Sequence, residues 1–305
     1  MKLPTEARAE QDDATAGLAN WLRLEGGSFQ MGSDHHYPEE APAHWEQVEG
    51  FEIQDTPVTN AMFAEFIACT GYVTQAERPL NSEEYPGVAL AQLQPASLVF
   101  TPPTRAVLLD DARRWWSLIP GADWCHPQGP DSDLRKMENH PVVHVGLEDA
   151  MAYAQWAGCD LPTEQEWEYA AWGGHSGSEF VWGRELVPGG QYMANTWQGA
   201  FPNENLEADG YARTSPARAF PANGYGLFDM IGNVWEWTTA VYQPTHGNLV
   251  KSCCSSTKSS AGMRVLKGGS HLCAPNYCQR YRASARSPQA IDTTSSHTGF
   301  RCVRR

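Results

Sequence analysis

The sequence lacks several features that would assign it quickly to a class of protein. It contains no apolar run of 18 residues, so we expect no segment that spans a membrane. It shows no internal repeat, no heptad pattern and no low-complexity tract, and so gives no sign of a repeat array or a coiled coil. The first residues, MKLPTEARAEQDDATAG, have no apolar centre and do not resemble a secretory signal. We therefore expect a polar tail over residues 1–18 and one domain over residues 19–305.

The chain also has few positively charged residues, and its cysteines are not closely spaced. The chain has 22 Lys and Arg against 36 Asp and Glu, a formal net charge of −14, which disfavours a nucleic-acid binder or an anionic-membrane binder. Its eight cysteines are scattered instead of forming the closely spaced framework of a small disulfide-rich protein. These features favour a cytoplasmic protein in a reducing compartment.

Three residue types are abundant: the chain has 12 Trp, 27 Gly and 21 Pro. Many Gly and Pro predict short elements joined by many turns, and many Trp predict a core held by large aromatic side chains. We predict a single loop-rich α+β domain with little regular secondary structure.

Local patterns place a few elements. Trp21–Gly32 alternates around a Gly-Gly and predicts a hairpin, and Val48–Ile53 predicts a strand. Helices are predicted from Thr59 to Gly71, from Leu147 to Trp156, and after Thr163, which forms a T-x-x-E capping box with Glu166. Residues 80–112 show no regular period of apolar residues and are expected to lack regular secondary structure. Strands are predicted at Asn139–Val145 and at the end of the chain, from His297 to Val303.

The stretch from Lys267 to Arg286, KGGSHLCAPNYCQRYRASAR, contains Cys273 and Cys278, five residues apart. Residues at this spacing point to opposite faces of a strand and lie about 140° apart on a helix, so neither element brings both sulfurs together. The intervening Ala-Pro-Asn favours a bend that does. Such a pair can form a disulfide or bind a soft ion such as Cu(I), and the spacing does not decide between them. A closed zinc site is disfavoured because no second ligand pair accompanies the first.

Two other regions offer ligand atoms. Asn195–Tyr211 mixes Asn, Asp and Glu with Gly, a composition that can supply hard oxygen ligands to Ca²⁺. His140 and His144 have H-x-x-x-H spacing, but Pro141 and two valines between them favour a strand and structural roles.

Segments along almost the whole chain resemble the formylglycine-generating enzyme family, also called the sulfatase-modifying factor family, of prokaryotic type. They are GGSFQMGS (26–33), TGYVTQAERP (70–79), PGADWCHPQGPDS (120–132), HPVVHV (140–145), LPTEQEWEYAA (161–171), ANTWQGAFP (194–202), NGYGLFDMIGNVWEW (223–237) and GGSHLCAPNYCQRYR (268–282). The last block is the specific one, since it carries the family's copper-binding thiols. The resemblance implies the FGE-sulfatase fold, similar to C-type lectins, with residues 19–305 as its catalytic domain.

The resemblance also implies an activity. Members use Cu(I) and O₂ to convert the cysteine of a Cys-x-Pro-x-Arg segment, in an unfolded or nascent sulfatase polypeptide, into Cα-formylglycine. By position, Cys273 and Cys278 match the copper ligands and Ser270 matches the active-site serine, while Tyr277 and Trp235 match residues that line the pocket. A monomer is expected.

Structural calcium is implied as well, in two sets of ligands. The first set is Asn195, Thr196 (backbone), Asp209 and Tyr211 (backbone), and the second is Asp229, Gly232 (backbone), Val234 (backbone) and Glu236. Asp229 stands where Asn is common in the family.

The chain also departs from the family's secreted members. Two disulfides of those members are not expected here, because Cys302 would face Ala154 and the other pair falls on Ala171 and Ala283. Adjacent Cys253 and Cys254 are not a family feature.

Two alternatives share the fold. An iron-dependent sulfoxide synthase requires an H-x-x-x-H-x-E ligand set, whereas here Gly146 follows two residues after His144. A non-catalytic, lectin-like binding module remains the other alternative, although such a module would not need both thiols and the serine.

Overall fold

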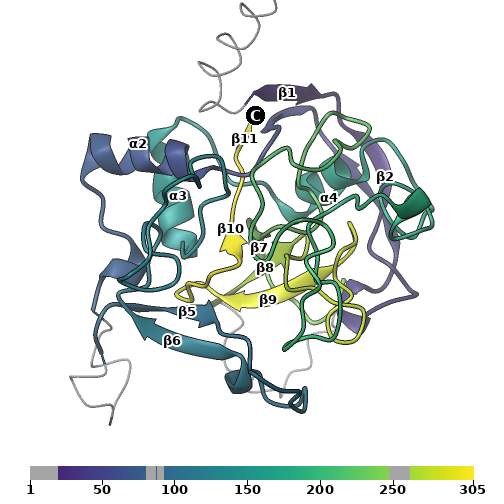
Figure 1. Ribbon diagram of the computed structural model, residues 1–305. Coiled ribbons are helices and arrows are strands. Elements are labelled where there is room, and N and C mark those ends of the chain that lie inside the picture. The colour runs from purple at the N-terminus through teal and green to yellow at the C-terminus, as the bar shows by residue number, and fades with distance from the viewer. Residues whose placement is uncertain (1–19, 80–86, 88–92, 247–261) are drawn as a thin grey trace, which may run out of the picture.

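The computed structural model describes residues 20–79, 87, 93–246 and 262–305 (Figure 1). The predicted tail, residues 1–18, and the Cys253–Cys254 pair lie outside the described residues. Within them the helices are α2 (Asn60–Thr70), α3 (Leu147–Trp156) and α4 (Glu164–Trp172), with 3₁₀ turns at Pro38–Glu40, Gln75–Glu77, Ala112–Arg114 and Pro188–Gly190. The strands are β1 (Trp21–Leu24), β2 (Gly27–Met31), β3 (His44–Val48), β4 (Phe51–Gln54), β5 (Ala96–Phe100), β6 (Trp116–Pro120), β7 (Trp235–Val241), β8 (Met263–Lys267), β9 (Arg286–Ala290), β10 (Thr298–Gly299) and β11 (Val303–Arg304).

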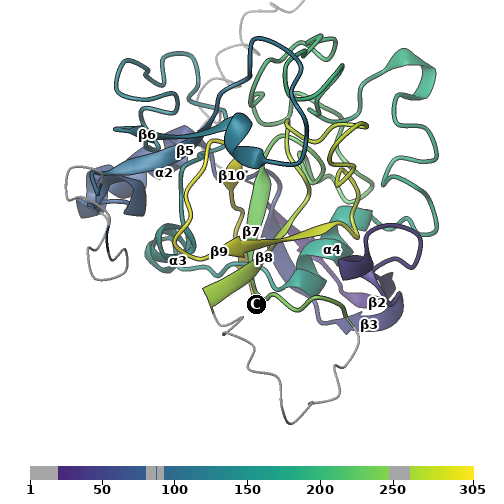
Figure 2. The ribbon, with the colours of Figure 1, turned by 90° about the horizontal axis from the view of Figure 1, so that it is seen from below.

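A four-stranded sheet in the order β10-β7-β8-β9 occupies the middle of the molecule. β10 runs parallel to β7, and the β7–β8 and β8–β9 pairs are antiparallel. Helices α3 and α4 lie on either side of this sheet (Figures 1 and 2). Smaller sheets, β1-β4-β11, β2-β3 and β5-β6, surround it, and long loops join them. The prediction of a loop-rich α+β domain is confirmed.

The predicted hairpin within Trp21–Gly32 is wrong. β1 pairs with β4 and β2 pairs with β3, so the whole segment is one arm of a longer hairpin that turns between Met31 and His44. The Gly26-Gly27 pair bends this arm instead of reversing it, and a side chain on Gly26 would collide with the backbone of Val48 on the other arm. The predicted strand Val48–Ile53 is likewise divided, since β3 ends at Val48 and β4 begins at Phe51.

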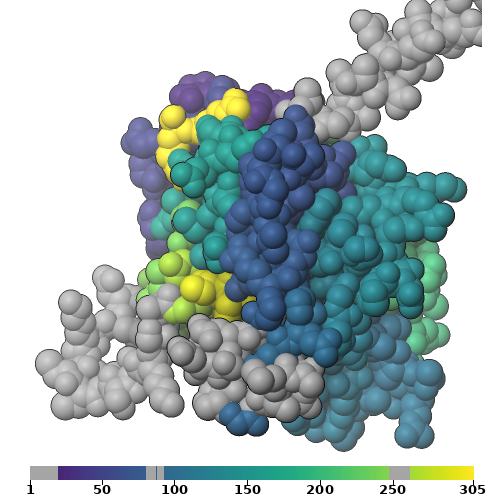
Figure 3. Space-filling model, turned by 90° about the vertical axis from the view of Figure 1, so that its left-hand side faces the viewer, coloured from purple at the N-terminus to yellow at the C-terminus, as the bar shows by residue number. Residues whose placement is uncertain are grey.

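The helix predictions are confirmed, because their end signals are local. Thr59 accepts a hydrogen bond from the Met62 backbone N–H at the start of α2, and Gly71 ends the helix in the left-handed conformation with φ of 63°. Thr163 and Glu166 form the predicted capping box of α4. α2 covers the centre of the face seen in Figure 3.

Two predicted strands differ from the structure. Asn139–Val145 is not a strand: it makes one isolated bridge, between Pro141 and Thr59, and His144 has a positive φ of 60°, which ends any extended run. The segment His297–Val303 holds two very short strands, β10 and the start of β11, with buried residues between them. The expected irregular region, 80–112, contains β5, which pairs with β6.

Among the described residues, no helix combines the length and the apolar character needed to cross a bilayer.

Candidate active site

The two cysteines of the sequence prediction lie in the loop that joins β8 to β9. The strands meet at the register pair Lys267 and Arg286, so residues 268–285 form a closed loop at the end of this antiparallel pair. Gly269 has a φ of +76°, and a side chain there would collide with the Arg280 carbonyl at 2.4 Å and press on the Cys273 sulfur at 3.3 Å. Glycine at this position therefore lets the two ends of the loop pass close together beside the thiols.

The structure brings Cys273 and Cys278 together. Their Sγ atoms are 3.2 Å apart, and both thiols are free. This separation exceeds the S–S bond of about 2.05 Å in a disulfide. The bend over Ala274–Tyr277 is closed by the Cys278 N–H, which donates to the Ala274 carbonyl at 3.0 Å. Two sulfur atoms at this distance form a donor set suited to one soft ion.

The two thiols differ in acidity. The hydrogen bond that the Cys273 thiol donates lowers the pKa of Cys278 to about 6, and the positive charge of Arg280 acts in the same direction. Burial raises the pKa of Cys273, and the neighbouring Cys278 thiolate raises it further. Near neutral pH the pair therefore carries one thiolate, on Cys278, and one shared proton.

A cavity of about 230 Å³ opens above the pair. Aromatic rings dominate its wall, and its polar residues include two serines, a histidine and an arginine besides the thiols. Its lining consists of Trp115, Trp116, Phe201, Trp235, Ser270, Leu272, Cys273, Tyr277, Cys278, Arg280, Ser287 and His297. Cys273 is fully buried, whereas Cys278 is partly exposed, so the cavity reaches the pair mainly through Cys278.

Ser270, the predicted active-site serine, is in contact with both the dithiol and a histidine that the sequence prediction missed. Its backbone N–H faces the Cys273 sulfur at 3.4 Å, and its Oγ lies 3.1 Å from His297 Nδ1. Burial lowers the pKa of His297 to about 3, so the ring is neutral. Because Ser270 and His297 belong to different segments, no local spacing pattern links them.

Arg280 is the second residue that the sequence prediction missed. Its Nη1 lies 3.8 Å from the Cys278 sulfur, and its Nη2 donates to Glu39 at 2.5 Å. Its guanidinium also lies 3.9 Å from the centre of the Tyr37 ring, a cation–π contact. Glu39 and Tyr37 thus hold a positive charge beside the more acidic thiol. The run of Arg and Tyr after Cys278 was the available signal.

The other two predicted residues shape the cavity wall. Tyr277 is 41% exposed and stacks on Phe201, with ring centres 4.7 Å apart and planes 5° apart. Trp235 is buried at the start of β7 and faces the cavity from the sheet. Both contribute aromatic surface to the lining of the cavity.

Three residues of the first predicted calcium set, Thr196, Asp209 and Tyr211, are in contact. The Asp209 carboxylate accepts from the backbone N–H of Thr196 at 3.3 Å and of Tyr211 at 3.0 Å. The amide of Gln198 donates both to the Thr196 carbonyl and to Asp209, so these two acceptors face one point. Within the described part of the chain, the buried Oδ1 of Asn195 has no hydrogen-bond partner. Amide, carboxylate and carbonyl oxygens are the ligand types that a hard cation such as Ca²⁺ takes.

The second predicted set fits calcium less completely. Both oxygens of Glu236 are engaged by Arg301, at 2.7 and 2.8 Å, and Trp167 donates to one of them. Glu236 is thus already neutralised by a buried guanidinium. Burial raises the pKa of Asp229 to about 6, and its oxygens accept from the Arg218 backbone and from Asn233. Gly232 and Val234 lie between these carboxylates on the same buried segment.

The histidines of the iron alternative are occupied by other contacts. His144 Nδ1 lies 2.7 Å from Ser97 Oγ, and its Nε2 lies 3.0 Å from the Pro127 carbonyl. His140 Nδ1 contacts Thr214. The two rings do not share a ligand site, in agreement with the structural roles predicted for them.

Comparisons with known proteins agree with one another. Residues 6–305 match the model of the sulfatase-modifying factor enzyme 1-like domain. The chain is 54% identical over 293 residues to a formylglycine-generating enzyme of Mycobacterium tuberculosis, covering 94% of this chain and 98% of the relative. It is 44% identical over 287 residues to a formylglycine-generating enzyme of Streptomyces coelicolor, covering 92% of this chain and 88% of the relative.

A solved structure supports the fold independently. PvdO from Pseudomonas aeruginosa superposes with a TM-score of 0.61 at 23% sequence identity, covering 95% of this chain and 98% of PvdO. At this identity the likeness concerns the fold alone. Taken with the sequence matches, it shows that the chain belongs to the formylglycine-generating enzyme (sulfatase-modifying factor) family.

Proposed function

We propose that this protein converts the cysteine of a Cys-x-Pro-x-Arg segment in a sulfatase polypeptide into Cα-formylglycine, using Cu(I) and O₂. The observation that supports this most directly is the pair of free thiols, 3.2 Å apart, on the floor of an open cavity beside Ser270. The 54% identity to a formylglycine-generating enzyme, over nearly the full length of both chains, supports the substrate class.

The residues present suit a copper(I) ion. Cys273 and Cys278 would hold it, since sulfur ligands select soft ions and since one of the two is a thiolate near neutral pH. When bound, copper(I) would supply the one-electron chemistry with O₂ that neither sulfur nor serine can provide. Binding by both sulfurs requires the shared proton to leave, and Arg280 offsets the negative charge that remains.

The chain's own groups would position the substrate and limit access of water. Trp115, Phe201 and Tyr277 form a rigid aromatic wall in which each ring contacts the other two edge-to-face or stacked. An extended peptide that carries a proline can pack against such a wall. Ser270 can hydrogen-bond a polar group in the cavity while neutral His297 fixes the direction of its hydroxyl.

Other parts of the proposal concern the whole protein. Calcium would bind the first set, Asn195, Thr196, Asp209 and Tyr211, and brace the segment that packs against the dithiol loop, since the Trp197 N–H donates to the Cys273 carbonyl at 3.0 Å. Calcium at the second set stays a prediction. Free thiols suit a reducing compartment, so we place the enzyme in the cytoplasm, acting as a monomer on unfolded or nascent sulfatase.

The test is a conversion assay. Protein loaded with Cu(I) is mixed with a Cys-x-Pro-x-Arg peptide in air, and the peptide is examined by mass spectrometry for the thiol-to-aldehyde mass loss. We expect conversion only with both copper and O₂. Conversion that persists without oxygen, or in Cys273→Ser at full rate, would contradict the proposal, as would no conversion by the fully loaded protein.

A further inference from the structure

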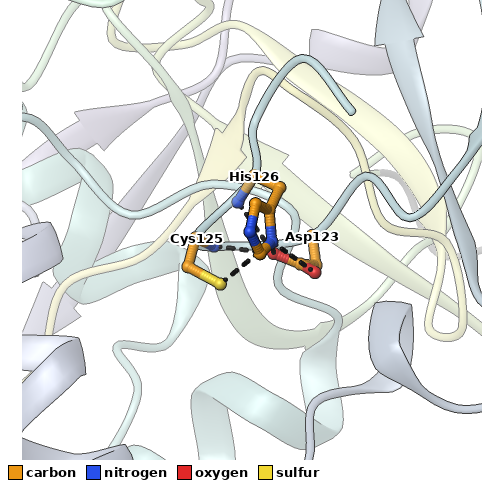
Figure 4. A group of neighbouring side chains, drawn as sticks. All are labelled: Asp123, Cys125 and His126. Carbon is orange, nitrogen blue, oxygen red and sulfur yellow. Dashed lines mark hydrogen bonds and ion pairs between the residues drawn. The ribbon is translucent and has the colours of Figure 1, made fainter. Parts of the chain in front are cut away.

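A second group of potential metal ligands lies in the turn that follows β6. Asp123, Cys125 and His126 place a carboxylate, a thiol and an imidazole together, with their ligand atoms all within 4.8 Å of one another. Figure 4 shows the His126 ring between the other two side chains. His126 Nδ1 lies 3.2 Å from the Cys125 sulfur and 3.1 Å from each Asp123 oxygen. None of the three lines the dithiol cavity.

This arrangement is not that of a cysteine nucleophile. In a catalytic triad the two ring nitrogens of the histidine serve different partners, one the nucleophile and the other the carboxylate. Here the same nitrogen, Nδ1, faces both the thiol and the carboxylate. Burial raises the pKa of Cys125 to about 12, with Asp123 contributing, so the free thiol is also unreactive at neutral pH.

The backbone holds the carboxylate in place. The N–H groups of Cys125 and His126 both donate to Asp123 Oδ1 at 2.8 Å. Oδ1 is therefore fixed by two backbone donors, and Oδ2 is directed toward His126 Nδ1. Reciprocal hydrogen bonds of 3.3 Å between the main chains of Asp123 and His126 close the turn. The ligand atoms are thus positioned by the turn itself before any ion binds.

Two of the three separations between ligand atoms are close to those around a tetrahedral ion, and the third, between the Cys125 sulfur and Asp123, is at most 4.8 Å. Zinc lies about 2.3 Å from a cysteine sulfur and about 2.0–2.2 Å from histidine nitrogen or carboxylate oxygen, which puts two ligand atoms roughly 3.3–3.6 Å apart. The observed 3.2 Å and 3.1 Å are within a few tenths of an ångström of this range. We propose that Asp123, Cys125 and His126 form a three-ligand site for a divalent ion of the zinc class, with the fourth position open to water.

The surroundings favour a cation. Asp123 and, more distantly, Glu77 place negative charge beside the Cys125 thiol, and the same field attracts a divalent ion. As the sulfur–metal bond forms, the thiol releases its proton to water, so binding yields one proton for each ion. The His126 side chain is 41% exposed, and the site is reachable from solvent.

The position of the site suggests a bracing role for the ion. Trp124, between two of the ligands, is buried in the main core and packs edge-to-face on Phe63 of α2, with ring centres 5.4 Å apart. The carbonyl of Pro127, the residue after His126, accepts a hydrogen bond from buried His144. An ion on the outer side of this turn would hold Trp124 in its pocket and link α2 to the region after β6.

The test uses the full chain with Cys273→Ser and Cys278→Ser, so that the dithiol does not compete. Zn²⁺ is titrated against a chromophoric chelator, and Co²⁺ is titrated while the thiolate-to-metal absorption is followed. Adding Cys125→Ser should lower zinc affinity at least about 10-fold and remove the cobalt charge-transfer band. His126→Ala should lower the affinity similarly with the thiol intact. Cys69→Ser, which replaces an exposed cysteine, is the matched control. It should leave both the zinc affinity and the cobalt charge-transfer band unchanged.

Folding of each variant is checked by circular dichroism and by thermal unfolding without metal. Zinc should raise the Tm of the Cys69→Ser protein by several degrees and leave that of Cys125→Ser nearly unchanged. Equal zinc affinity in Cys125→Ser and Cys69→Ser would overturn the proposal, because the metal would then lie elsewhere. Absence of tight zinc binding in all the proteins would overturn it too.

Discussion

The described part of the chain contains two pairs of neighbouring thiols that are alike in chemistry and different in setting. In the first pair, Cys273 and Cys278, the hydrogen bond between the thiols lowers one pKa and raises the other. In the second, the hydrogen bond from Cys302 lowers the pKa of Cys159, while burial and the same contact raise the pKa of Cys302. A split in acidity therefore accompanies contact between two thiols and does not by itself mark an active site.

The settings separate the two pairs. Cys273 and Cys278 belong to one bent loop and face a cavity that also holds Ser270, His297 and Arg280. Cys159 and Cys302 are carried by two segments that join at the bridge between Asp160 and Val303, with backbone hydrogen bonds of 2.9 and 2.8 Å. The second pair thus fastens the C-terminal segment to the end of α3. Cys159 also lines a cavity, of about 1350 Å³, so an open cavity does not by itself separate the pairs. The polar partners Ser270, His297 and Arg280 distinguish the first pair.

The largest effect that should separate the pairs is on turnover. Cys278→Ser is expected to lower peptide conversion on the order of 10³-fold or more, since it would remove one of the two proposed copper ligands. Cys159→Ser should stay within about twofold, the range of substitutions away from a functional site. Both rates are measured by mass spectrometry with copper-loaded protein. Comparable losses in the two variants would show that the second pair also takes part in catalysis.

Oxidation should separate the pairs next. Each pair has one buried and one partly exposed thiol, so exposure alone predicts no difference. In apo protein, diamide is expected to oxidise Cys273 and Cys278 at least about 10-fold faster than Cys159 and Cys302, because the hydrogen bond from Cys273 and the nearby Arg280 lower the pKa of Cys278 to about 6 and keep it a thiolate. Peptide mapping after timed quenching gives both rates in one sample. A faster rate at Cys159 would show that the second pair holds the more reactive thiolate.

Arg280 provides a smaller and more specific difference. Alkylation of Cys278 in the apo protein should be half-maximal near pH 6 and should slow as the pH falls, because protonation removes the thiolate. Arg280→Met should shift this midpoint upward by up to about one pH unit, equivalent to about 1.4 kcal/mol. Arg280→Lys, which keeps the charge, is the matched control and should shift it less. The pH profile of Cys159 should not move in either variant, and a shift there would indicate a general structural change.

The smallest expected effect is on the free energy of unfolding when a cysteine of the second pair is replaced. Cys302→Ala removes a fully buried sulfur and should lower the free energy of unfolding by about 1–2 kcal/mol, through lost burial and a small cavity. Cys69→Ala, at an exposed position, should change it by less than about 0.5 kcal/mol. Denaturant unfolding with unchanged slopes gives both values. If Cys302→Ala lowered the free energy of unfolding by less than Cys69→Ala does, the sulfur of Cys302 would contribute nothing to packing.

The parts of the structure that the sequence predicted correctly depend on local signals. Thr59 and Gly71 bound α2, Thr163 and Glu166 start α4, and each acts within one helical turn. The bend that brings Cys273 to Cys278 is also local, and the prediction that two thiols meet there needed only the six residues involved. Short-range stereochemistry was sufficient in these cases.

What the sequence did not predict depends on distant partners. His297 reaches Ser270 only after β10 has paired with β7, and Glu39 reaches Arg280 from the far end of the chain. The Gly26-Gly27 pair was interpreted as a hairpin turn because nothing local distinguishes a reversal from a bend; the partner strand decides. The neighbouring thiol of Cys302 was also not predicted: it is that of Cys159, which donates to the carbonyl of Ala154, the residue predicted to face Cys302, at 3.4 Å.

The register pair that closes the dithiol loop has an evolutionary consequence. Lys267 and Arg286 are anchored from below by two glutamates of α4, since Glu168 accepts from Lys267 at 2.7 Å and Glu164 accepts from Arg286 at 2.8 Å. The feet of the loop are therefore tied to the scaffold through buried charges, independently of its exposed tip at Pro275–Tyr277. Because the tip is also the bend that brings Cys273 to Cys278, its side chains can vary only as far as that bend is kept, while the feet of the loop are inherited unchanged.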